Sequence, residues 1–146
     1  MERIMYKNIK FMSRNDMSLL AHNPLAIAIT ISDPKIPHLN LSDKFQSVLA
    51  LEFNNIESLI NHPNLVRFNL TNAQTISEFV KSHEGVAETI YVNCFKGESR
   101  SAAVALALSE YYQIPLESET SLHNKFIYKT LKKVLLKNEK KPSFGM

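Results

Sequence analysis

The chain has 146 residues, of which 45% are apolar, 17 are basic, 14 are acidic and one is cysteine. This length predicts a single domain over residues 1–146 with its own hydrophobic core, and a single cysteine excludes an internal disulfide. No uncharged apolar run reaches the roughly 18 residues that a membrane span needs, and the charged residues among the first 13 argue against a signal peptide. We therefore expect a soluble, cytoplasmic protein.

The first half of the chain predicts β-strands separated by short helical or irregular segments. Three apolar runs predict strands at 9–12, 26–31 and 48–53. Ser13 and Asp16 predict the start of a short helix that continues over 17–21. Pro63 interrupts residues 57–70, where we expect a short helix before the proline and a short strand after it.

The second half begins with a helix, a strand and another helix. Thr71 and Gln74 have the spacing of a capping box, and the apolar residues that follow predict a helix over 72–83 with one buried face. The residues of that face are Ala73, Ile76, Phe79 and Val80. A strand is predicted over 89–92, followed by a buried helix that is apolar on nearly every side and ends near Tyr112. This alternation of strands and helices is typical of an α/β fold.

The last helix follows Asn124, a residue type that often caps helix N-termini. Four apolar residues at helical spacing predict its buried face: Ile127, Leu131, Val134 and Leu135. Seven lysines lie between 125 and 141, and we interpret them as the solvated face of this helix followed by a flexible basic tail over 138–146. A surface for nucleic acid or anionic lipid is the less favoured alternative.

The segment between the strand at 89–92 and the apolar helix begins with Cys94 and ends with Arg100 and Ser101. A helix N-terminus leaves backbone N–H groups unpaired and attracts anions. This helix end and the guanidinium of Arg100 both favour the thiolate of Cys94, which is the nucleophilic form. The planar fork of Arg100 also fits two oxygens of a phosphate. Gly97 lets the backbone turn its N–H groups inward, and the Ser101 hydroxyl stabilises a departing thiolate.

The pattern Cys-x-x-Gly-x-Ser-Arg-Ser over 94–101 fixes five positions, which chance gives about once in millions of windows. The alternative is that Cys94 is simply a small buried residue at the end of a strand. Residues 92–101 resemble the signature of cysteine-dependent protein phosphatases, in particular the compact dual-specificity type. Four further segments extend the resemblance to small phosphatase-like proteins of bacteria and their phages: 26–34, 48–53, 73–80 and 124–131.

The resemblance implies a compact phosphatase-like α/β fold, with a central, mostly parallel sheet of four or five strands flanked by helices. It implies a hydrolase of the protein-tyrosine or dual-specificity phosphatase type, acting on phosphotyrosine, or on phosphoserine or phosphothreonine, of a phosphorylated protein or peptide. By this analogy Cys94 forms a phosphocysteine intermediate, Arg100 binds the phosphoryl group and Ser101 assists hydrolysis of the intermediate. The phosphate-binding residues would be Phe95, Lys96, Gly97, Glu98, Ser99 and Arg100. No metal or organic cofactor is implied.

The sequence departs from the family pattern at two points. Most members have a histidine immediately before the cysteine, where this chain has Asn93. Because an asparagine can still donate one fixed hydrogen bond, we expect an intact loop with some change in the thiolate pKa. Members also have an aspartic acid on a separate loop, a few tens of residues before the cysteine, that protonates the leaving alcohol. The chain has three aspartates, and none lies in that window: Asp16, Asp33 and Asp43.

Asn54 and Asn55 stand where the missing aspartate would align, and an amide cannot donate a proton as an acid does. Glu57 and His62 are the nearby groups that could replace it, although a surface carboxylate and a loop histidine are the simpler interpretations. Loss of a general acid lowers the reaction rate by about 10²- to 10⁴-fold, and the decrease is greatest for substrates with poor leaving groups. We therefore predict faster cleavage of phosphotyrosine or another aryl phosphate than of phosphoserine.

The sequence is also compatible with functions other than that of a protein phosphatase. The missing aspartate and Asn93 favour a phosphatase-like module that binds phosphorylated partners but turns over slowly. Lys96 is compatible with a more anionic substrate, such as a phosphoinositide or an RNA 5′ phosphate, unless it points to solvent beside the pocket with Glu98 offsetting its charge. Arsenate reductases and sulfurtransferases fit less well, because the former place their cysteine near the N-terminus and the latter lack this loop ending.

Overall fold

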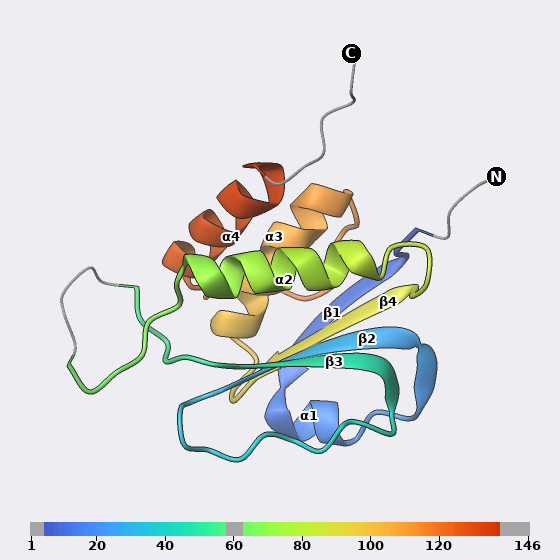
Figure 1. The fold of residues 1–146 in the computed structure, drawn as a ribbon, viewed down its shortest axis with the longest axis horizontal. Helices are drawn as coiled ribbons and strands as arrows, with labels where there is room; N and C mark the ends of the chain where they lie inside the picture. The colour runs from blue at the N-terminus through green and yellow to red at the C-terminus, as the bar shows by residue number, and fades with distance from the viewer. Residues whose placement is uncertain (1–4, 58–62, 138–146) are drawn as a thin grey trace, which may run out of the picture.

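The computed structural model describes residues 5–57 and 63–137 of the chain. Within these residues it shows an α/β fold (Figure 1). The strands are β1 (Asn8–Ser13), β2 (Asn23–Ser32), β3 (Phe45–Glu52) and β4 (Thr89–Cys94). The helices are α1 (Arg14–Ser18), α2 (Leu70–Ser82), α3 (Arg100–Tyr112) and α4 (Lys125–Lys137). The tail predicted over 138–146 and the helix predicted just before Pro63 fall at least partly outside the described residues.

The four strands form one parallel sheet in the order β1-β4-β2-β3. This confirms the predicted α/β class with a central, mostly parallel sheet of four or five strands, and the described sheet has four. β4 and β2 are the interior strands, and each is the neighbour of the other. Because all strands run in the same direction, their carboxyl ends share one edge of the sheet, which is where open α/β folds bind ligands.

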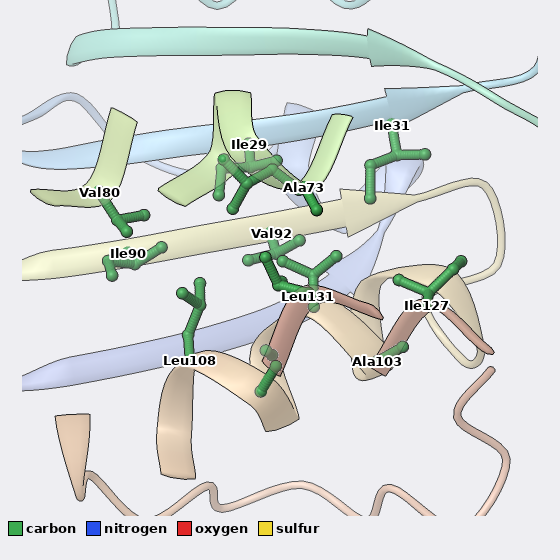
Figure 2. Close-up of a cluster of buried hydrophobic side chains, with 14 of the residues drawn as sticks. Ile29, Ile31, Ala73, Val80, Ile90, Val92, Ala103, Leu108, Ile127 and Leu131 are labelled. Carbon is green, nitrogen blue, oxygen red and sulfur yellow. The ribbon is translucent and has the colours of Figure 1, made fainter. Parts of the chain in front are cut away.

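The two faces of the sheet are covered unequally. α2, α3 and α4 lie over one face, and the short α1 lies over the other (Figure 1). Alternate residues of β2 serve the two cores: Ile27, Ile29 and Ile31 pack toward the three helices, whereas Ala26 and Ala28 pack with Met17 of α1. Figure 2 shows the larger core, in which side chains of the sheet meet those of α2, α3 and α4.

The helices bury the faces that the sequence predicts. α3 is buried along most of its length, as its apolar composition indicates. The Oδ1 atom of Asn124 accepts a hydrogen bond of 3.0 Å from the backbone N–H of Ile127, so the predicted cap of α4 is confirmed. The four predicted inward residues of α4 are buried, and Lys125, Lys129 and Lys133 are exposed.

Two local predictions are wrong. α2 begins at Leu70, because Asn69 and Asn72 form the capping box instead of Thr71 and Gln74. The side-chain oxygen of each asparagine accepts from the backbone N–H of the other, at 2.8 and 3.0 Å. Asparagine is as good a cap as serine or threonine, and this pair comes first in the chain.

The strand expected after Pro63 is also wrong, since residues 63–69 of the described chain form turns and irregular structure. Hydrogen bonds to Asn54, rather than pairing with a neighbouring strand, hold this segment in place. The backbone N–H of Asn54 donates to Val66 O, and its Oδ1 accepts from Val66 N, both at 2.7 Å. An asparagine side chain that takes up a backbone N–H in this way competes with strand pairing.

Candidate active site

The segment over 95–99 is an irregular loop that connects the interior strand β4 to the N-terminus of α3. Gly97 lies in this loop with a φ of +75°, in the left-handed region that favours glycine. The loop packs against the end of β1, where the backbone N–H of Arg14 donates to Phe95 O at 3.1 Å. A Cβ atom at Gly97 would lie 2.3 Å from the backbone nitrogen of Ser13, so only glycine fits this approach.

The N-terminus of α3 points at the sulfur of Cys94. The backbone N–H of Ser101 donates to Cys94 Sγ at 3.4 Å, and the Ser101 hydroxyl lies 3.2 Å from the same atom. Ser99, the residue before the helix, does not cap it, since its hydroxyl donates to Asn55 Oδ1 at 3.1 Å. The first N–H groups of α3 are therefore available to the thiolate and to an anion beside it.

These contacts decide the protonation state of Cys94. Burial raises the pKa of the thiol, but hydrogen bonds from the Ser101 side chain and backbone, a hydrogen bond from the Gly97 backbone and the charge of Arg100 all lower it. The net result is a pKa below the ordinary value of a thiol. The arrangement therefore supplies a thiolate nucleophile closer to neutral pH than a free cysteine would.

We expect the alkylation of Cys94 by iodoacetamide to show this lowered pKa directly. The rate follows the thiolate fraction, which rises with pH, so a lowered pKa moves the rise to lower pH than for free cysteine. Mass spectrometry of the full chain measures it unambiguously, because the chain has one cysteine. Ser101→Ala removes the hydroxyl at 3.2 Å and is expected to move the midpoint upward. A midpoint at or above that of free cysteine would contradict the assignment.

Arg100 is buried and held in a fixed orientation. Its Nη1 atom donates to Asp33 Oδ1 at 2.7 Å and to the backbone oxygen of Phe53 at 2.8 Å. These two bonds use both hydrogens of Nη1. Within 5–57 and 63–137, the hydrogens on Nε and Nη2 have no acceptor. The remaining edge of the guanidinium is therefore free to bind two oxygens of one oxyanion.

A cavity of about 360 Å³ brings these groups together at the carboxyl edge of the sheet. It is lined by Asp33, Asn55, Cys94, Phe95, Lys96, Glu98, Ser99 and Arg100. Lys96 and Arg100 bring positive charge, Asp33 and Glu98 bring negative charge, and the sulfur of Cys94 lies in the wall. The cavity thus holds a nucleophile, a guanidinium edge and a helix N-terminus around one space.

Most of the predicted site residues belong to this cavity or support it. Cys94, Arg100 and the predicted loop residues line it, except that Gly97 shapes the loop and Ser101 is fully buried behind the sulfur. Glu57 lies elsewhere: its Oε2 accepts from the backbone N–H of Lys125 at 2.6 Å, at the start of α4. The structure gives Glu57 a helix-capping contact rather than a place in the cavity. His62 lies outside the described residues.

Asp33 is the site residue that the sequence reasoning missed. It lies far from Cys94 in the chain, outside the window in which the resemblance predicts an aspartate. β2 ends at Ser32 and pairs with β4 in parallel, so the residue after β2 lies beside the loop after β4. An Asp-Pro pair directly after a buried strand was the available signal. Asn55 reaches the cavity in the same way from the end of β3, and its Oδ1 also accepts from Asn124 Nδ2 at 2.7 Å.

Asn93 is buried and supports the loop weakly. Its Nδ2 donates to Cys94 O at 3.4 Å, whereas its Oδ1 has no hydrogen-bond partner among the described residues. The neighbouring Thr30, which is its register partner on β2, has an unpartnered Oγ1 in the same part of the structure. Unpaired buried polar atoms are costly, so Asn93 Oδ1 and Thr30 Oγ1 leave this part of the interior incompletely hydrogen-bonded.

The described chain shows no group of three or more histidine, cysteine, aspartate or glutamate side chains placed to hold a metal ion. None of its helices is both long enough and apolar enough to cross a membrane. Comparison of the sequence with known protein families and with curated proteins finds no match. An assignment of function therefore depends on the signature in the sequence and on the geometry of the cavity.

Proposed function

We propose that the chain is a cysteine-dependent phosphomonoesterase that acts on aryl phosphates, with phosphotyrosine of a protein or peptide as the substrate class. One observation carries the proposal. The sulfur of Cys94 receives hydrogen bonds from the N-terminus of α3 in a cavity that also presents the free edge of Arg100. A thiol of lowered pKa beside a site for an oxyanion suits phosphoryl transfer through a covalent cysteine intermediate.

The chemistry follows from these positions. The thiolate of Cys94 attacks phosphorus, the P–O bond to the substrate breaks, and the phosphoryl group is transferred to sulfur. Arg100 and the backbone N–H groups of the loop stabilise the charge on the equatorial oxygens. Water then attacks the phosphocysteine and releases phosphate, and the Ser101 hydroxyl, 3.2 Å from sulfur, stabilises the departing thiolate. These steps need no electron donor or acceptor.

Two carboxyl groups line the described cavity, Asp33 and Glu98, and we assign neither of them as the general acid. Asp33 is the aspartate that lines the cavity, but its Oδ1 already accepts a hydrogen bond of 2.7 Å from Arg100. We therefore propose that Asp33 orients the guanidinium of Arg100. Glu98 belongs to the phosphate-binding loop, and Asn55 stands at the end of β3. Without an acid, the leaving group departs as an anion, which favours phenols over alkyl alcohols.

We therefore expect hydrolysis of para-nitrophenyl phosphate and phosphotyrosine peptides, and at least about 10²-fold slower cleavage of matched phosphoserine peptides. Initial rates with the full chain, with orthovanadate as inhibitor, measure both. Asp33→Asn serves as the diagnostic variant: if Asp33 only orients Arg100, it slows substrates with good and poor leaving groups by the same factor. A larger loss for poor leaving groups would show that Asp33 donates the proton, and equal rates for phosphoserine and phosphotyrosine would refute the preference.

A phosphate-binding module with little turnover is the second candidate. Two features favour it, because neither supplies a proton to a leaving group. Asn55, which lines the cavity, carries an amide instead of an acid, and Asp33 is already paired with Arg100. The two functions differ in one measurement: such a module binds a phosphotyrosine peptide but releases no phosphate from para-nitrophenyl phosphate.

A further inference from the structure

A second cavity adjoins the first at the same edge of the sheet. Its volume is about 270 Å³, and it is lined by Arg14, Ile31, Ser32, Asp33, Ile36 and Phe95. Asp33 and Phe95 line both cavities. A substrate whose phosphate lies beside Cys94 would therefore reach the second cavity without leaving the protein surface.

The walls of the second cavity are apolar and partly open to solvent. Ile31 is buried in β2, whereas Ile36 and Phe95 are 46% and 63% exposed. Ile36 and Phe95 therefore present exposed apolar surface to this cavity. This volume is smaller than that of sites that enclose a whole small molecule, which is about 300–1,000 Å³. It suits a single side chain of a larger substrate.

The polar groups that line this cavity indicate which kind of ligand it can bind. The hydroxyl of Ser32 is already hydrogen-bonded to His38 Nδ1 at 3.2 Å, and Asp33 is paired with Arg100. Arg14 is half-buried, and among the described residues its guanidinium has no acceptor and no ion-pair partner. A guanidinium beside apolar walls binds the face of an aromatic ring well, since the ring offers both apolar area and a negative face.

We infer that this cavity binds an aromatic side chain of the substrate, located within two positions of the phosphotyrosine. The inference depends on the proposed function, because it takes the phosphate to lie in the first cavity. It adds a substrate preference that the phosphate-binding loop does not determine. Ile36 and Phe95 would contact the ring, and the guanidinium of Arg14 would lie over one of its faces.

The test measures binding, so that it does not depend on turnover. Phosphotyrosine peptides carry phenylalanine, alanine or glutamate at each of the two positions on either side of the phosphotyrosine. Their dissociation constants for the Cys94→Ser variant of the full chain are measured by fluorescence polarisation. We expect phenylalanine to bind about tenfold more tightly than alanine at one position, a typical contribution of one group in an apolar pocket.

Variants then locate the effect. Ile36→Ala is expected to reduce the phenylalanine-to-alanine ratio toward one. Leu25→Ala is the matched control, because Leu25 is 45% exposed, like Ile36, but lies near the start of β2 and lines neither cavity. Equal affinity for phenylalanine and alanine at all four positions would overturn the inference. So would a preference for glutamate, which would make Arg14 a partner for a carboxylate.

The failure of the proposed function has a different signature. It would appear as the absence of para-nitrophenyl phosphate hydrolysis by the unmodified chain, whatever the peptide preference. A chain that binds aromatic-flanked phosphopeptides but does not hydrolyse them retains the aromatic subsite and loses only the catalytic assignment. Absence of binding to every phosphopeptide, with hydrolysis of para-nitrophenyl phosphate retained, would overturn the aromatic subsite and the phosphotyrosine substrate class but not the phosphomonoesterase assignment.

Discussion

Cys94→Ser is expected to abolish hydrolysis of para-nitrophenyl phosphate while phosphate binding persists. A serine hydroxyl is not ionised near neutral pH, and among the described residues no carboxylate or histidine is hydrogen-bonded to the side chain at position 94, whose partner is Ser101. If Cys94 is the nucleophile, its loss should lower kcat by about 10⁴-fold or more, as in enzymes with covalent intermediates. The N–H groups of α3 and the guanidinium of Arg100 are unchanged, so a phosphotyrosine peptide should still bind.

Initial rates and fluorescence polarisation on the same preparation measure the two parts of this prediction. Ser101→Ala is the matched control, since it alters the contact to sulfur but keeps the thiol. It should slow turnover without abolishing it, because the Ser101 N–H at 3.4 Å is a backbone group and remains. Equal residual rates for the unmodified chain and Cys94→Ser would remove the enzyme interpretation altogether.

Gly97→Ala should disrupt the loop over 95–99, which we propose to bind phosphate. The φ of +75° is strained for alanine, and the new Cβ would meet Ser13 N at 2.3 Å and the Met12 carbonyl carbon at 2.4 Å. These are backbone atoms of β1, which cannot move away as a flexible side chain does. We expect the free energy of unfolding to fall by about 3 kcal/mol, the upper end for such strain, or about 6–12 °C in Tm.

Activity should fall with it, because the displaced loop no longer directs its N–H groups at the phosphate. Differential scanning calorimetry and initial rates at a temperature well below Tm separate the two effects. Gly85→Ala is the matched control: Gly85 also has a positive φ, of +83°, but lies in the turn before β4, away from the cavity. It should lose about 1 kcal/mol of stability and keep its activity. If Gly97→Ala retained full activity, the loop would not form the phosphate site.

Several features of the fold were predictable because they depend on local pattern. The apolar run at 26–31 predicts a strand that is buried on both faces, and the structure shows one. The longer apolar run after Arg100 predicts a helix that is buried on nearly every side, and α3 is such a helix. The cap at Asn124 was predictable because capping is a contact between residues three apart. The start of α2 was not, since two overlapping pairs, Asn69 with Asn72 and Thr71 with Gln74, both satisfy the rule.

The candidate site divides in the same way. The sequence by itself determined the segment from Cys94 to Ser101, because the thiol, the turn, the guanidinium and the helix N-terminus are neighbours in the chain and their chemistry is local. Only the tertiary structure decided which distant groups meet that segment. Parallel strands bring Asp33 from the end of β2 and Asn55 from the end of β3 to the loop after β4, whereas Glu57, close by in sequence to Asn55, contacts the start of α4. Which strand ends share an edge depends on strand order, and strand order is fixed by packing across the whole sheet.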